Sequence, residues 1–281
     1  MSAYTVLRDD FRNARRSSVV LGVIGVFTVL TALVFVSEID IYDHAYRTLF
    51  DVTMLVGLVF PLFVAPLTYL SIAGDRSGGA MKYVLGLPNS RFEYFVGKFV
   101  SRASVAVAAI LVAVFVGFVV AAATFTNGAD PVRFLAFAAV SVLYALSTVS
   151  IFVAISASTA SRSRAMFGVF GSYFVLVPFM FGFLPVLSLG TLVDAVSSLL
   201  GVTVSAETEE LITMLSPATA YLQSTELVFR GVFDQYEAFG MFSPGSDNLA
   251  RQAWFTVLVM VAWTVGAFGA GYAKFRASEL G

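Results

Sequence analysis

Six long stretches of the chain are almost entirely apolar and contain no Asp, Glu, Lys, Arg or His. A helix that crosses a bilayer needs about 20 such residues, because the hydrocarbon core is about 30 Å thick and each residue rises about 1.5 Å. Charged residues make up only 12% of the chain and hydrophobic residues 58%, which a soluble fold of this length could not bury. We therefore predict an all-α, polytopic membrane protein with six transmembrane helices. They lie at residues 19–36, 52–73, 103–125, 134–159, 165–189 and 252–273.

The distribution of Lys and Arg predicts the orientation of these helices, because basic residues concentrate on the cytoplasmic side of a membrane. Thirteen of the 17 fall in the N-terminal arm, the loops after the second and fourth spans, and the C-terminal tail. We therefore expect both ends of the chain and these two loops in the cytoplasm (N-in/C-in). Thirteen of the 18 acidic residues fall on the other side, and with 14 Arg against three Lys this acidic outer face suits a salt-loving prokaryote.

The N-terminal arm, residues 1–17, places apolar residues at helical spacing and arginines on the other face. Such an amphipathic helix lies in the membrane interface; a disordered basic arm is the alternative. The first span is longer than the apolar core of a secretory signal, and we expect it to be retained. Residues 18–281 then form a single membrane domain. The apolar positions of the arm are Tyr4, Leu7, Phe11 and Ala14.

A long outer segment, residues 190–251, separates the fifth span from the sixth. Loops of this length are usually functional or disordered, but this one keeps apolar stretches at 192–200 and 211–215, and Pro217 opens a further helical stretch. We expect short helices that pack on the outer leaflet or dip into it.

Two of the spans contain pairs of prolines. Pro61 and Pro66 fall in the second span, and Pro178 and Pro185 in the fifth. Proline kinks a membrane helix, and neighbouring groups can satisfy the carbonyls that it frees. Most such kinks only shape packing, whereas a minority mark broken helices at a transport site.

The loop between the second and third spans, residues 74–101, has more local structure than a chain reversal needs. Gly78 and Gly79 break the chain, and a short apolar turn at 80–87 follows. Pro88 stops that turn, because its ring removes a donor and disfavours helix at the preceding residue. The simpler interpretation is a connection that only reverses the chain.

The second half of this loop carries a helix start signal. Ser90 and Glu93 have the spacing of a capping box, in which each side chain satisfies a backbone N–H of the other residue. We therefore predict a short helix, a sharp turn and a second helix that leads into the third span.

Most catalytic chemistry is absent from the sequence. There is no cysteine, His44 is the single histidine, and no P-loop, G-x-S-x-G or H-E-x-x-H motif occurs. We expect no catalytic, cofactor or metal site in this chain, and the serines that crowd residues 141–158 are interpreted as packing residues. Ion-coupled transporters and proton pumps usually keep ionisable residues inside the membrane, so charge-free spans argue against a secondary transporter or channel.

On these residues the chain resembles the membrane subunit of ABC transporters of the type-two exporter class, most closely the permeases associated with copper-enzyme maturation. The resemblance covers nearly the whole chain. Ala80 stands where the family usually has threonine, and Ser77 where an acid is common. Weaker matches are residues 215–221 and the aromatic-basic end at 271–280. The strongest matches are Gly74-Asp75-Arg76, Gly78-Gly79, Leu87-Pro88, Ser90-Arg91 and Gly97-Lys98.

The resemblance implies that residues 74–101 carry a coupling helix that sits on a separate P-loop ATPase subunit. It also implies a second permease copy, as a homodimer or heterodimer, in the cell (plasma) membrane of a prokaryote, with no nucleic-acid partner. ATP and Mg²⁺ would be bound by the ATPase, and this chain would hold no cofactor. The residues that it assigns to ATPase coupling are Asp75, Arg76, Gly78, Gly79, Lys82, Pro88, Ser90 and Arg91.

The sequence thus favours the permease subunit of an ABC transporter that exports its substrate. An alternative is a non-transporting scaffold or sensor subunit of an ABC-like complex, in which the outer segment would serve as the recognition surface. An intramembrane enzyme is disfavoured, because no nucleophile–base pair or metal constellation occurs. The sequence does not identify the substrate.

Overall fold

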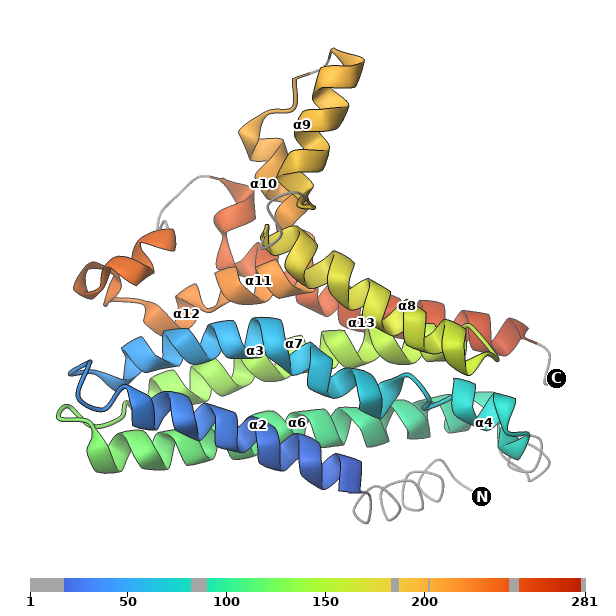
Figure 1. Cartoon of the computed structure of the whole chain (residues 1–281), viewed down its shortest axis with the longest axis horizontal. Coiled ribbons are helices and arrows are strands. Elements are labelled where there is room, and N and C mark those ends of the chain that lie inside the picture. The colour runs from blue at the N-terminus through green and yellow to red at the C-terminus, as the bar shows by residue number, and fades with distance from the viewer. Residues whose placement is uncertain (1–17, 82–89, 183–186, 202, 243–247, 279–281) are drawn as a thin grey trace.

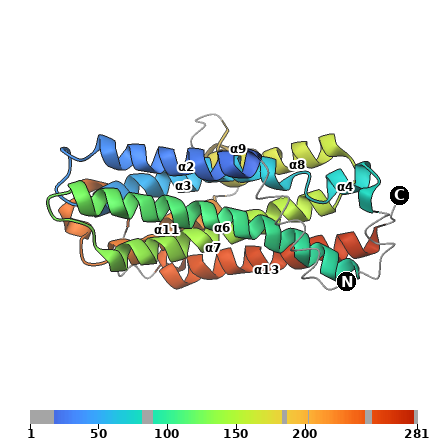
Figure 2. The same ribbon diagram turned by 90° about the horizontal axis from the view of Figure 1, so that it is seen from below.

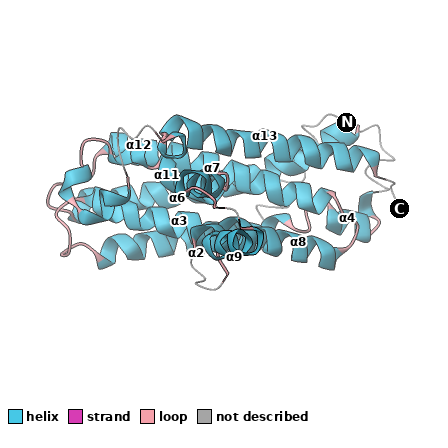
Figure 3. Ribbon diagram, turned by 90° about the horizontal axis from the view of Figure 1, so that it is seen from above, coloured by secondary structure: helices cyan, strands magenta, loops and turns pink. Residues whose placement is uncertain are grey.

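The computed structural model describes residues 18–81, 90–182, 187–201, 203–242 and 248–278, and within these ranges the chain is helical with no strand (Figures 1 and 3). The predicted interfacial helix at 1–17 lies outside the described residues. Five helices are long and apolar enough to cross a membrane. They are α2 (Ser18–Ser37), α3 (Ala45–Thr68), α6 (Arg91–Thr124), α7 (Pro131–Ala157) and α13 (Ala253–Ala277).

These five helices run side by side along the long axis of the molecule, with α2 and α13 at opposite edges (Figure 2). The most buried of them is α7, which packs against α3, α6 and α13. Small residues allow the close approaches, as expected for helices in lipid. A Cβ on Gly117 of α6 would lie 2.6 Å from the Phe35 ring of α2, and one on Gly271 of α13 would lie 2.7 Å from Ala154 of α7.

The fifth predicted span, residues 165–189, is not one continuous α-helix. Helix α8 (Arg162–Phe174) passes into a π-helix, η1 (Val175–Phe179), and Gly182 then takes a positive φ of 70°. The physical reason is Pro178 inside η1, which has no N–H to donate and whose ring disturbs the ladder of the preceding turn. Periodicity and hydropathy locate the apolar run but do not show where its hydrogen bonding changes.

Helices α11 (Pro217–Ser224) and α12 (Glu226–Phe229) continue from the level at which η1 stops. Ser216 donates a hydrogen bond to the Leu176 carbonyl of η1. From there Tyr221 reaches Ser141 in the middle of α7, and Arg133 near the start of α7 donates to the Val228 carbonyl at 2.6 Å. Helices α11 and α12 therefore pack against η1 and α7, although they lie far from α8 in sequence.

Helices α9 (Leu189–Leu200) and α10 (Ala206–Met214) lie between η1 and α11 in the sequence and form an antiparallel pair that stands away from the bundle (Figure 1). Side-chain caps start both helices, from Ser188 and Ser205, and Gly201 ends α9 in the left-handed conformation. The expectation of short helices in the outer segment is confirmed. Three 3₁₀ turns follow: η2 (Phe233–Gln235), η3 (Glu237–Met241) and η4 (Leu249–Arg251).

One end of the bundle gathers the helix α4 (Ala73–Ser77), the starts of α6 and α8, and the end of α13, and the start of α2 points toward it (Figure 1). We call it the α4 end. The start of α2 thus points toward the end at which α13 stops, as the predicted N-in/C-in topology requires. The described parts of the two basic loops, at α4, the start of α6 and the start of α8, lie there as well.

Candidate functional site

The candidate site is the start of the 74–101 loop, where α3 ends and α4 begins. Between these helices the backbone turns, and the buried hydroxyl of Ser156 in α7 holds the turn. It accepts hydrogen bonds from the N–H groups of Ile72 and Ala73, both at 3.1 Å, and donates to the Tyr69 carbonyl at 2.9 Å. A side chain from another helix therefore caps α4.

Asp75 joins α4 to α6. Its carboxylate accepts a hydrogen bond from the Tyr94 hydroxyl at 2.6 Å and pairs with the Lys98 ammonium at 3.0 Å. The Lys98 side chain is only 12% exposed, and its ammonium also lies 5.7 Å from the centre of the Tyr94 ring. Partial burial increases the Coulomb attraction between the two charges, and the removal of both charges from water opposes that gain.

The other face of α4 is tied to the turn between α7 and α8. Arg76 donates to the Ala157 carbonyl at 3.2 Å. The Arg162 guanidinium donates to the Ser77 hydroxyl at 2.9 Å. Helix α4 is thus bound to α6 on one side and to α7 and α8 on the other.

The two glycines that follow α4 have different reasons to be glycine. A Cβ on Gly78 would lie 3.2 Å from the Gly74 carbonyl oxygen. Gly79 has a φ of +74°, which L-residues adopt only with strain, although space around it is open. The predicted chain break is therefore present. Lys82 and Pro88, with the predicted turn at 80–87 beyond Met81, lie outside the described residues.

The predicted capping box at the start of α6 is confirmed. The Ser90 hydroxyl accepts from the Glu93 N–H at 3.1 Å, and the Glu93 carboxylate accepts from the Ser90 N–H at 2.8 Å. Arg91 then reaches the last helix, donating to the carbonyls of Arg276 at 2.6 Å and Ser278 at 2.9 Å. The start of α6 and the end of α13 are thus linked at the same end of the bundle.

The sequence model for ABC-2 family transporter proteins matches residues 4–280. The chain belongs to this family. Comparison with individually curated proteins gives no match. The ABC-2 family assignment makes the chain a membrane transport component without an ATPase domain of its own, from a family whose members generally work with a P-loop ATPase.

In this ABC-2 chain the sequence-predicted site residues that the structure describes do lie together at the α4 end. Three further residues that the sequence did not single out also contact α4: Tyr94, Ser156 and Arg162. Ser156 was interpreted as one of several packing serines, and no sequence signal distinguishes it, because its role depends on the turn of another helix. Arg162 was indicated only weakly by the sequence, as part of the predicted basic loop after the fourth span.

The opposite end of the ABC-2 chain holds a cavity of about 270 Å³. Its Arg133 is already engaged, with the Asp130 carboxylate at 3.2 Å and the Val228 and Arg230 carbonyls. No three His, Asp or Glu side chains within the described ranges are placed to hold a metal ion. The polar side chains that line the cavity are His44, Tyr46, Asn127, Asp130, Arg133 and Gln235.

Proposed function

We propose that this chain is the membrane subunit of an ABC exporter and that a separate P-loop ATPase binds the segment 74–101 and drives it. The observation that carries the proposal is the set of contacts around α4. Asp75 holds α6, Arg76 holds the end of α7, and Ser77 holds the start of α8. A displacement of this short helix would be passed to three membrane helices at once.

The charge-free spans support the same conclusion from another direction. They offer no proton relay and no ion-binding carboxylate at membrane depth, so the energy for transport enters from outside the spans. The polar contacts around α4, at the α4 end of the bundle, supply a physical route for that energy. In this proposal ATP and Mg²⁺ stay on the partner subunit.

We further place the complex in the plasma membrane of a salt-loving prokaryote, with two permease copies, and among the permeases associated with copper-enzyme maturation. The motif residues of the 74–98 segment support the last assignment, and the acidic outer face supports the salt-loving source. Genes for a metalloenzyme next to that of the chain would support the copper-related group. Loss of stability in high salt would count against a salt-loving source.

Co-isolation from native membranes tests the proposal. A tagged chain, extracted in mild detergent, should bring down a P-loop ATPase in near-stoichiometric amount, identified by mass spectrometry. Arg76→Ala and Arg230→Ala form a matched pair, because each removes one arginine, at the α4 end and at the opposite end respectively. The first should weaken ATPase recovery and the second should not. Purified chain that transports without any ATPase would overturn the proposal.

A further inference from the structure

The last turns of α13 pack against the first turns of α6 at the α4 end. Tyr94 and Phe95 of α6 are buried, and both rings stack on the buried Phe275 ring of α13, with ring centres 5.7 and 6.0 Å apart. Stacked and edge-on ring pairs are favourable beyond the area that they bury. Aromatic contacts therefore join the two helices over several turns. The other ring pairs are Phe92 with Tyr272, Phe95 with Tyr272 and Phe268, and Phe99 with Phe268.

Arg91 fixes the end of α13 along the helix axis. The carbonyls in the last turn of a helix have no partner within that helix, and this end carries partial negative charge. The Arg91 guanidinium donates to the carbonyls of Arg276 at 2.6 Å and of Ser278 at 2.9 Å. Packed helices slide past each other by small amounts, and these directional hydrogen bonds oppose such sliding between α6 and α13.

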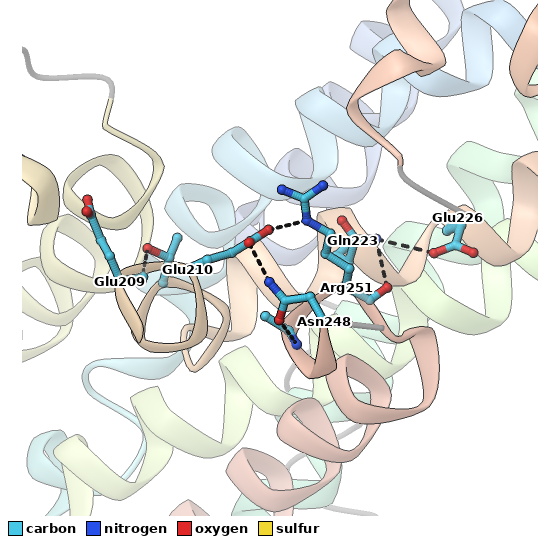
Figure 4. Close-up of polar contacts among 8 residues, drawn as sticks. Glu209, Glu210, Gln223, Glu226, Asn248 and Arg251 are labelled. Carbon is cyan, nitrogen blue, oxygen red and sulfur yellow. Dashed lines mark hydrogen bonds and ion pairs between the residues drawn. The ribbon is translucent and has the colours of Figure 1, made fainter. Parts of the chain in front are cut away.

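The opposite end of α13 is bound to the outer segment. Arg251, just before α13, pairs with Glu210 of α10 at 2.6 Å, and Glu210 also accepts a hydrogen bond from Asn248 at 2.7 Å (Figure 4). The Arg251 carbonyl accepts a hydrogen bond at 3.2 Å from Gln223 of α11. The start of α13 is therefore joined to both α10 and α11.

Between these two ends α13 is a single α-helix of 25 residues with no proline. Two more polar contacts hold it to the outer segment: Ser224 and Thr256 share a hydrogen bond at 2.8 Å, and the Trp263 indole donates to the Leu215 carbonyl at 2.8 Å. Prolines disturb the hydrogen bonding of α3 and η1. An uninterrupted helix is the better element for passing a displacement from one end of the bundle to the other.

We infer that Arg91 is a positioning residue that makes α6 and α13 move as one body, and that α13 carries the displacement of the α4 end to the outer segment. The inference rests on the proposed function, in which α4 receives the force of an ATPase. It gives Arg91 a contact within this chain in place of the contact with the ATPase that the family resemblance implies. Movement of α10 and α11 would then follow the ATPase cycle through α13.

Steady-state ATP hydrolysis by the reconstituted complex tests the role of Arg91. Arg91→Ala should lower kcat several-fold and leave both the KM for ATP and the recovery of the ATPase unchanged. Arg91→Lys should restore much of the lost kcat, because lysine still donates to one of the two carbonyls. At the other end of α13, Arg251→Ala should lower kcat as well, whereas Arg230→Ala, in the same outer segment, should not.

The double variant Arg91→Ala/Arg251→Ala gives the sharpest comparison. Two changes at opposite ends of a molecule normally act independently, so their fold losses in kcat multiply. If α13 links them, either change already breaks the connection, and the double variant should lose no more than the more damaging single variant. Multiplied losses would overturn the inference. So would an unchanged kcat in either single variant, or a loss of ATPase recovery with Arg91→Ala.

The same preparations separate failure of the inference from failure of the proposed function. A complex of the unchanged chain that contains no ATPase rejects the proposed function. A complex that contains an active ATPase but shows multiplied losses rejects only the role of Arg91 and α13.

Discussion

Buried hydroxyl groups satisfy backbone groups at two interruptions of the helices in this chain. Pro61 has no N–H, so the carbonyl of Gly57, four residues earlier, has no helical donor. The Tyr144 hydroxyl supplies one at 2.8 Å. Ser156 does the same for two N–H groups at the α3–α4 turn. The sequence located Pro61 and the serine-rich run, but which hydroxyl meets which freed group depends on the packing of α7 and could not be deduced from it.

Replacing Ser156 with alanine should destabilise the protein by about 1–3 kcal/mol, because buried backbone groups lose their only side-chain partner at that turn. Thermal unfolding in nanodiscs measures the change. Ser158→Ala is the matched control: Ser158 is exposed and bonds only to the Ile155 carbonyl of its own helix. Equal unfolding temperatures for the two variants would contradict the capping role of Ser156.

Glu38, just after α2, is the acidic group outside the spans whose pKa the structure raises to about 6 from 4.5. Burial is the main cause; the nearby Asp51 carboxylate also raises the pKa, whereas Thr48 and Arg47 lower it. A raised pKa means that the folded chain holds this proton more tightly than the unfolded chain. Ionised Glu38 therefore destabilises the folded chain. This loss of stability is absent below about pH 4.5 and complete above about pH 6.

Glu38→Gln should consequently raise the unfolding temperature at pH 7.5 and flatten the fall in stability between about pH 4.5 and 6. The gain should stay below about 1 kcal/mol, because the side chain is partly in water and its interactions are screened. Unfolding temperatures across this pH range test it, with Asp40→Asn of the same exposed loop as the comparison. If the stability of the Glu38→Gln variant depends on pH in the same way as that of the unchanged chain, the raised pKa of Glu38 is contradicted.

At the scale of elements, hydropathy and charge located the helices well and the interruptions poorly. Five of the spans are single helices, and the Ser90–Glu93 cap is where the spacing placed it. The fifth span is helical without a break from residue 162 to residue 181, but a π-helix interrupts its α-helical hydrogen bonding around Pro178, and an apolar run has the same composition with or without that change. Helix α11 packs beside Tyr144 of α7. This packing depends on contacts between residues distant in sequence, which no local pattern encodes.

The contact between α7 and α13 depends on Gly271, and its neighbour Gly269 provides a control in the same helix. Gly271→Ala should destabilise by about 1–3 kcal/mol, because its Cβ would collide with the backbone of Ala154. Gly269 has nothing within 4 Å of a Cβ. Its replacement by alanine should be neutral or stabilising by up to about 1 kcal/mol, since alanine favours helix. The reverse order of unfolding temperatures would contradict this packing.

At the scale of the whole molecule, the sequence predicted a charge-free membrane bundle with a structured basic loop at one end, and the structure adds how that loop is attached. Asp75, Arg76 and Ser77 contact three different helices, so α4 cannot move independently of them. Those contacts could not be predicted, because their partners come from α6, α7 and α8. Our central proposal is that force from an ATPase enters the molecule at the α4 end.

The most direct test compares two glycines that share a backbone conformation but lie at opposite ends of the bundle. Gly79 follows α4 with a φ of 74°, and Gly128 lies in the outer turn before α7 with a φ of 65°. Alanine at either should strain the turn by about 1–2 kcal/mol. ATP hydrolysis by the reconstituted complex should fall several-fold with Gly79→Ala and stay near that of the unchanged complex with Gly128→Ala. Equal hydrolysis by the two variants would show that the α4 end does not transmit the ATPase motion.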